Sequence, residues 1–173
     1  MRKPSRAVEL EDIISAHIIG DDPEIISTVL NTHLALEAIL IEALGLLQAG
    51  DKKFYHTFPA KTSWLAAQGV IKEEDKAAFD RFNDFRNDLA HIFGHQITLA
   101  DALALARDLE ALGIDFSDSV GHYSEADASE YYDGIIGVLA EIGWCILFHA
   151  AHLLMEAGGR DIFSAPDAGT TRT

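Results

Sequence analysis

The segment from Phe82 to Phe93 reads FNDFRNDLAHIF, and it holds an arginine and a histidine separated by four residues, Arg86 and His91. An imidazole can give and take protons near neutral pH, and a guanidinium can hold a phosphate through paired hydrogen bonds. These are the groups needed to cleave a phosphodiester through the 2′-OH of RNA without a metal ion. Asn87 lies four residues before His91, so on a helix it shares a face with the imidazole and can orient it.

The spacing of Arg86 and His91 limits how one chain can use them. Five residues along a helix rotate by about 500°, so the two side chains point about 140° apart. One helix does not easily aim both at one phosphate, whereas two helices crossing at a two-fold axis can. The spacing is therefore best used in a homodimer, in which two copies of His91 act as base and acid and two copies of Arg86 hold the phosphate.

A second interpretation of the same residues is structural. Arg86 can pair with Asp80, with Asp84 or with an acid on another helix, and His91 can bond a loop backbone. The chain has 13 Lys and Arg against 28 Asp and Glu, a formal net charge of −15. This balance argues against a general nucleic-acid coat and against binding to an anionic membrane, because both need basic surfaces. It leaves a small local basic site open.

Helical spacing runs through almost the whole chain, with Gly or Pro at the boundaries. We predict a single all-α domain over residues 1–157, built as a bundle of about five to six helices with two long ones. Residues 158–173 are expected to form a loose tail, and residues 52–59 a loop. The predicted helices cover residues 8–19, 23–47, 61–69, 72–93, 99–112 and 124–156.

The run from Arg86 to His91, RNDLAH, resembles the signature of the HEPN superfamily, an Arg and a His four to six residues apart that is often written RNxxxH. The segment FPAKTSWLAAQGVI around Lys61 looks like the short helix that precedes the motif in several HEPN-like families. The segment LALEAIL around Glu37 is similar to their first long helix. Mannitol-repressor-like and other bacterial HEPN-like groups share this layout, and the resemblance covers roughly residues 22–157.

The resemblance implies a helical bundle that forms a homodimer and needs no cofactor. Many HEPN proteins are metal-independent endoribonucleases, often toxins or defence factors that act with an antitoxin, and others are catalytically inactive regulatory or protein-interaction modules. For this chain it implies RNA rather than DNA as substrate, with Arg86, His91 and Asn87 at the catalytic site. Phe93 stands where the toxins paired with a nucleotidyltransferase carry a Tyr, so regulation through that Tyr is not implied.

A third interpretation is a helical metal-binding protein. His149 and His152 are three residues apart and share a helix face, and carboxylates such as Glu37, Glu42 and Glu141 can complete a site in a bundle. The paired Glu-x-x-His motifs that di-metal bundles use are missing from the sequence. The residues therefore favour this interpretation least.

We predict structural roles for the remaining residues with reactive or titratable side chains. Cys145 lies in the most apolar segment and is expected to be a buried structural thiol. His33 is expected to be a satisfied core or interface histidine. The apolar segment 135–155 is interrupted by ionisable residues, so we expect a buried or oligomer-interface helix and no membrane span. Residues 1–19 lack a continuous apolar stretch, which favours a cytoplasmic protein.

Overall fold

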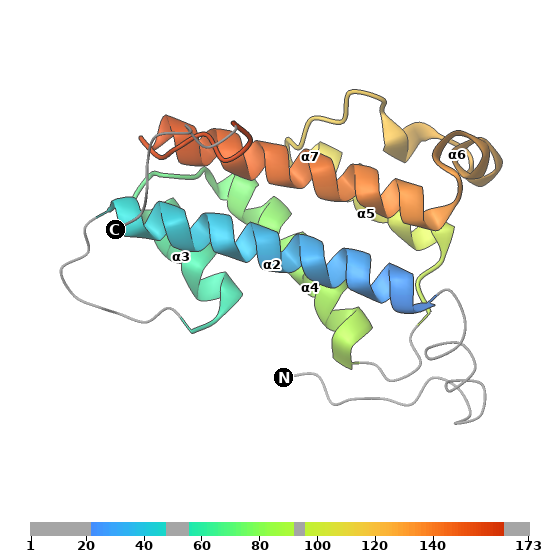
Figure 1. The fold of residues 1–173 in the computed structure, drawn as a ribbon, viewed down its shortest axis with the longest axis horizontal. Helices are drawn as coiled ribbons and strands as arrows, with labels where there is room; N and C mark the ends of the chain where they lie inside the picture. The colour runs from blue at the N-terminus through green and yellow to red at the C-terminus, as the bar shows by residue number, and fades with distance from the viewer. Residues whose placement is uncertain (1–21, 48–55, 92–95, 165–173) are drawn as a thin grey trace.

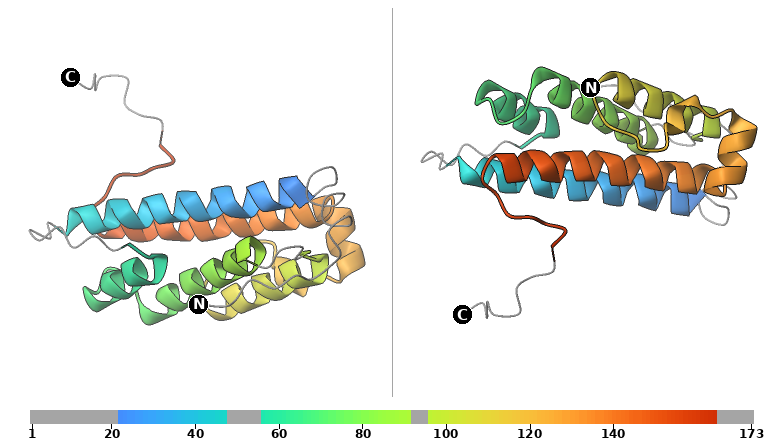
Figure 2. Two further views of the ribbon diagram at one scale, coloured as in Figure 1. Left: turned by 90° about the horizontal axis from the view of Figure 1, so that it is seen from below. Right: turned by 90° about the horizontal axis from the view of Figure 1, so that it is seen from above.

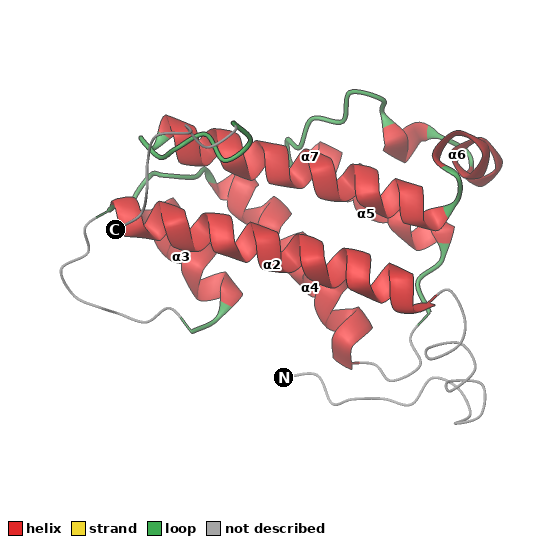
Figure 3. Ribbon diagram, viewed as in Figure 1, coloured by secondary structure: helices red, strands yellow, loops and turns green. Residues whose placement is uncertain are grey.

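The computed structural model describes residues 22–47, 56–91 and 96–164, and all the regular elements in these ranges are helical (Figure 1, Figure 3). In chain order they are α2 (Asp22–Leu46), α3 (Phe58–Ala67), α4 (Glu73–His91), α5 (Leu99–Ala111), the 3-10 turn η2 (Val120–His122), α6 (Glu125–Tyr132) and α7 (Ile135–Glu156). The predicted all-α bundle with two long helices is confirmed. The helix expected at 8–19 lies outside the described residues.

The helices form two layers (Figure 2). The long helices α2 and α7 run side by side in the same direction and make the most extensive helix–helix contact of the described chain. Helices α3, α4 and α5 form the second layer, and α6 lies at the end where α2 and α7 begin (Figure 1). Between the layers lies a core of fully buried side chains, the largest of which include Val29, Leu36, Phe79, Phe82, Leu105, Leu109, Ile142 and Ile146.

Helix α3 begins earlier than predicted. The hydroxyl of Thr57 accepts a hydrogen bond from the backbone N–H of Ala60 at 3.3 Å, and Pro59 lies in the first turn. A proline is favoured there because the first N–H groups of a helix have no partner inside it. The predicted loop over 52–59 is therefore wrong from Phe58 onward, since Phe58 and Pro59 already belong to the first turn of α3.

The predicted continuous helix over 124–156 is wrong at one point, where α6 ends and α7 begins. Ser124 caps α6, with its hydroxyl accepting a hydrogen bond from the N–H of Asp127 at 3.2 Å. Asp133 then adopts a left-handed conformation, with φ 58°, and Gly134 has φ 87°. Asp and Gly are the residues that tolerate this region best, so the chain turns here and α6 packs across the end of the bundle.

Part of the expected tail packs against the first layer. The Nε and Nη2 groups of Arg160 donate to the carboxylate of Glu42 at 2.7 and 3.1 Å. The ring of Phe163 stacks on that of Phe148, with centroids 4.4 Å apart. Residues as far as Ser164 therefore run back over α2 and α7, and the rest of the expected tail lies outside the described residues.

Helices α2 and α7 are also the most apolar of the described helices. Their segments Pro23–Leu46 and Ile135–Glu156 are long and apolar enough to cross a membrane, judged by length and composition alone. The core helices of soluble proteins meet the same criterion, so this is weak evidence for a span. The expectation of a cytoplasmic protein without a membrane stays a prediction.

Candidate functional site

Arg86 lies on the last third of α4 and is half-buried. Its Nη1 donates a hydrogen bond to the amide oxygen of Asn87 at 3.0 Å. Its Nε–H is buried and has no hydrogen-bond partner among the described groups. Asn87 thus orients the guanidinium of Arg86, whereas its predicted contact with His91 involves a side chain outside the described residues.

Asp80 and Asp84, the two acids of α4 expected as partners of Arg86 in the structural interpretation, do not pair with it in the described chain. Asp80 accepts from the hydroxyl of Thr62 at 2.7 Å and from the Nζ of Lys76 at 2.8 Å. Asp84 is exposed to solvent. Within residues 22–47, 56–91 and 96–164, Arg86 forms no ion pair with a carboxylate. The structural interpretation, in which Arg86 serves an ion pair, finds no such pair in this part of the chain.

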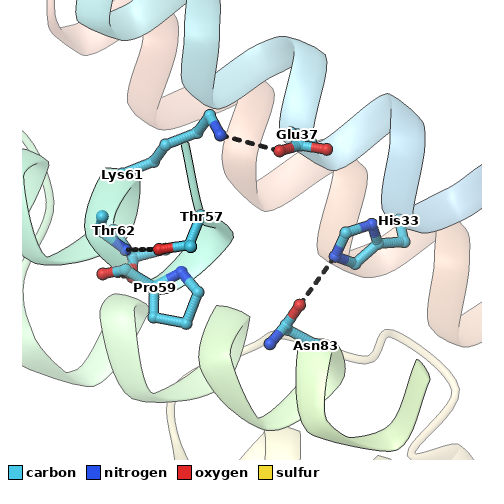
Figure 4. Close-up of polar contacts among 8 residues, drawn as sticks. His33, Glu37, Thr57, Pro59, Lys61, Thr62 and Asn83 are labelled. Atoms are coloured by element: carbon cyan, nitrogen blue, oxygen red, sulfur yellow. Dashed lines mark hydrogen bonds and ion pairs between the residues drawn. The ribbon is translucent and has the colours of Figure 1, made fainter. Parts of the chain in front are cut away.

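A buried hydrogen bond joins α2 to α4 one turn before Arg86 (Figure 4). His33 is only 3% exposed, and its Nε2 lies 3.0 Å from the amide oxygen of Asn83. Its ring also packs against Phe58, with ring centroids 4.8 Å apart. The Nδ1 of His33 is buried without a partner among the described groups. The prediction of a core histidine is confirmed, but only one of the two ring nitrogens is satisfied.

An ion pair lies beside this hydrogen bond. Lys61 of α3, whose side chain is buried, donates to Glu37 of α2 at 2.9 Å (Figure 4). Burial lowers the pKa of His33 below its ordinary value of 6.5. The hydrogen bond with Asn83 raises this pKa, the charge of Arg86 lowers it, Glu37 raises it and Lys61 lowers it, in decreasing order of effect.

These residues of α2, α3 and α4 form one polar region, here called the α2–α4 polar cluster. Its members are His33, Glu37, Lys61, Asn83, Arg86 and Asn87.

No family model, curated protein or solved structure matches the chain. The HEPN resemblance accordingly stays a prediction. The function is argued below from the chain's own residues.

His91 is the last residue of α4, and the backbone is helical from Glu73 through it. On this helical backbone, positions 86 and 91 are about 140° apart around the helix axis. The side chain of His91, and Phe93 as a whole, lie outside the described residues.

The two histidines of the metal interpretation face different surroundings. The Nε2 of His149 lies 2.7 Å from Asp75, which also accepts from the backbone N–H of Lys72 at the start of α4. His152 is exposed, and its Nε2 lies 3.4 Å from Glu156. In the part of the chain that the structure describes, no three His, Cys, Asp or Glu side chains are grouped as metal ligands.

Cys145 has the environment of an unreactive thiol. Its Sγ donates to the carboxylate of Glu141 at 3.3 Å. Burial and then the contact with Glu141 raise the pKa of the thiol to about 12. The reactive form is the thiolate, which this raised pKa disfavours at neutral pH. The predicted burial holds only in part, since Cys145 is half-buried.

A second region stands out on the other side of α2. We call it the α2–α7 outer face, and it is formed by the exposed rings of Trp144, Phe148 and Phe163, which pack on one another; Leu34 and Ile41 of α2 are exposed as well. The Trp144 and Phe148 rings pack on each other, with centroids 5.4 Å apart, yet each residue is 53% exposed. Between the two helices lies an apolar hollow of about 250 Å³ whose floor includes Ala35 and Ala38.

Proposed function

We propose that this protein is a HEPN-like endoribonuclease that holds an RNA phosphate at Arg86 and cleaves the chain through the substrate's own 2′-OH. The supporting observation is the state of Arg86. In a chain with 28 acidic residues, this half-buried guanidinium has no carboxylate partner within the described residues and is oriented by the neutral Asn87. A guanidinium that no carboxylate engages is suited to bind a phosphate in two-point fashion.

The proposed reaction needs no metal ion. A base removes the proton of the 2′-OH, the 2′-oxygen attacks phosphorus, and an acid gives a proton to the departing 5′-oxygen. The products are a 2′,3′-cyclic phosphate and a 5′-OH, and DNA is not a substrate because it lacks the nucleophile. His91 of two copies supplies the base and the acid, and Arg86 stabilises the charge that develops on the phosphate oxygens.

The proposed site requires a homodimer in which the carboxyl-terminal ends of two α4 helices meet, because Arg86 and His91 of one helix diverge. The net charge of −15 repels RNA at long range. We therefore expect a basic protein partner, such as an antitoxin or regulator, to hold the enzyme or deliver its substrate.

The test is RNA cleavage in EDTA by the wild type, Arg86→Ala and His91→Ala. Matched controls are Arg81→Ala, an arginine of the same helix that pairs with Asp108 at 2.9 Å, and His152→Ala, an exposed histidine. The proposal expects wild-type cleavage with 2′,3′-cyclic ends, its loss in the first two variants and its retention in the controls. Absence of cleavage by a dimeric wild type on any RNA would overturn it.

A second candidate is a catalytically inactive regulatory or protein-interaction module, and the α2–α7 outer face favours it. The aromatic rings of Trp144, Phe148 and Phe163 alone expose on the order of 300 Å², given that a free aromatic side chain presents roughly 150–250 Å². Contiguous apolar patches of this size often mark interaction sites. A second copy of the chain suits this face, because two strongly acidic copies approach best where neither carries charge.

The two candidates differ in assembly. The outer face belongs to the layer of α2 and α7, whereas Arg86 belongs to α4 in the other layer (Figure 2). A dimer formed through the outer face alone does not bring Arg86 of one copy to His91 of the other.

A further inference from the structure

We infer that His33 is a positioning residue for Arg86: a neutral imidazole on α2 that fixes Asn83 and, with it, the turn of α4 that presents the guanidinium (Figure 4). The catalytic part of this inference, that His33 affects turnover, rests on the proposed function. The structural part, that His33 holds Asn83 and Arg86 in place, rests only on the contact between α2 and α4.

The contact has one donor and one acceptor. The amide oxygen of Asn83 can only accept, so the Nε2 of His33 carries the hydrogen and donates across 3.0 Å. Asn83 is itself 5% exposed, so this bond forms away from water. Asn83 and Arg86 are three residues apart and share a face of α4. Holding Asn83 therefore sets the rotation of the helix turn from which Arg86 projects.

The groups around His33 keep it neutral. Arg86 approaches from α4 and Lys61 from α3, and both disfavour a second positive charge. Glu37, on α2 itself, favours the charged ring, but its carboxylate is engaged by Lys61 at 2.9 Å. The ring of Phe58 covers the imidazole and keeps water away. Burial lowers the pKa of His33, in agreement with this geometry.

Neutrality matters because Arg86 has few restraints of its own. Its Nη1 bonds to Asn87, and its buried Nε–H has no partner among the described groups. A protonated His33 would repel the guanidinium, and a missing His33 would release Asn83. In either case the guanidinium moves relative to a bound phosphate, and such displacements lower turnover by on the order of tenfold to a hundredfold.

The structural part is tested by NMR of side-chain nitrogens in the full chain. We expect His33 to be the Nε2–H tautomer with a titration midpoint below 6.5. We expect the Arg86 Nε–H signal, identified by its loss in Arg86→Lys, to be protected from solvent exchange. It should shift or broaden in His33→Ala and return in His33→Gln, which restores an amide donor. His122→Ala, an exposed histidine that pairs with Glu110, is the control.

Two results overturn this part. One is a wild-type His33 that is the Nδ1–H tautomer or titrates at or above 6.5, which needs no variant and holds even if His33→Ala does not fold. The other is an Arg86 signal that is unchanged in folded His33→Ala.

The catalytic part is tested by RNA cleavage kinetics of the same variants. We expect kcat to fall in His33→Ala with little change in KM, and to recover in His33→Gln. If the wild type cleaves no RNA while the NMR results are as expected, the proposed function fails and the link between His33 and Arg86 stands. If the wild type cleaves RNA and His33→Ala changes neither kcat nor the Arg86 signal, the positioning role fails and the endoribonuclease stands.

Discussion

Two neighbouring residues of α2 show how differently its two faces are used. His33 is 3% exposed and Leu34 is 58% exposed. Facing α3 and α4, the helix places the polar His33 and Glu37, whereas facing solvent it places Leu34 and Ile41. Burying polar groups costs free energy unless they are paired, and exposing large apolar groups forgoes their burial. α2 buries His33 beside apolar residues such as Val29 and Leu36, and it leaves Leu34 in solvent, so both positions are places to look for function.

The two regions also imply two different homodimers. Catalysis at the α2–α4 polar cluster requires contact between the α4 helices of two copies. Association through the α2–α7 outer face places the contact in the other layer (Figure 2). The predictions below test one region at a time, each against a variant of the other region or of a neutral position.

The largest effect is expected at Arg86. Replacing it with alanine should lower kcat for RNA cleavage by about 10²–10³-fold, the loss typical of one preorganised charge-stabilising group. Arg86→Lys keeps the charge but loses two-point binding, so it should recover only part of the rate. Single-turnover cleavage of a defined oligonucleotide measures both. Equal activity of Arg86→Lys and the wild type would count against two-point phosphate binding.

The next effect is expected on the outer face. Phe148→Glu places a charge between Trp144 and Phe163, and it should weaken self-association by at least about 2 kcal/mol if this face is an interface hot spot. The unfolding free energy of the monomer should change by less than about 1 kcal/mol, because Phe148 is half exposed.

Sedimentation velocity over a concentration series checks this, with His152→Glu on the exposed surface of the same helix as control. If Phe148→Glu sediments as the wild type does, the face is not a self-association surface. If the variant is monomeric and still cleaves RNA, the shared two-copy site is wrong.

Local signals in the sequence predicted much of the fold. Thr98 and Asp101 have the residue types and the spacing of a capping box, and both hydrogen bonds of that box form at the start of α5. Phe79, Phe82 and Phe85 recur at helical spacing in the sequence, and all three are buried on α4. Such patterns involve residues within one or two helix turns, so they can be recognised in the sequence without knowledge of the tertiary fold.

Features that depend on distant partners were not predictable. The second half of α2 is apolar nearly all round, so its pattern could not show that Leu34 faces solvent. Asn83 lies among phenylalanines, and its partner His33 is 50 residues away in sequence. The Arg86 and His91 spacing was visible, but the absence of a carboxylate beside Arg86 in the described chain is a tertiary property. The one local signal for the α2–α4 polar cluster was Asn83, a polar residue on the phenylalanine-rich face of α4.

A third prediction compares the two neighbours on α2 directly. His33→Ala should lower the unfolding free energy by about 1–3 kcal/mol, because it leaves the buried amide of Asn83 without its partner. Leu34→Ala should change it by no more than about 0.5 kcal/mol, since Leu34 is largely exposed. Urea unfolding at pH 8 and low protein concentration measures both. A larger loss for Leu34→Ala would mean that Leu34 is buried in the folded state studied.

The smallest expected effect is a pH dependence of the unfolding free energy that comes from His33, on the face of α2 that contacts α3 and α4. Burial lowers the pKa of His33 below the 6.5 of the unfolded chain, so on acidification the unfolded state takes up this proton first. The stabilising contribution of the neutral His33 is complete above pH 6.5 and is lost as the pH falls toward the folded-state pKa, by at most about 1.4 kcal/mol per pH unit.

His33→Gln cannot titrate, so the difference in unfolding free energy between the wild type and this variant should shrink from pH 8 to pH 5. The same comparison with Leu34→Ala should show no such change, because this substitution removes no titratable group. Parallel pH profiles for the wild type and His33→Gln would show that His33 is not held neutral by its surroundings, and the electrostatic distinction between the two faces of α2 would then disappear.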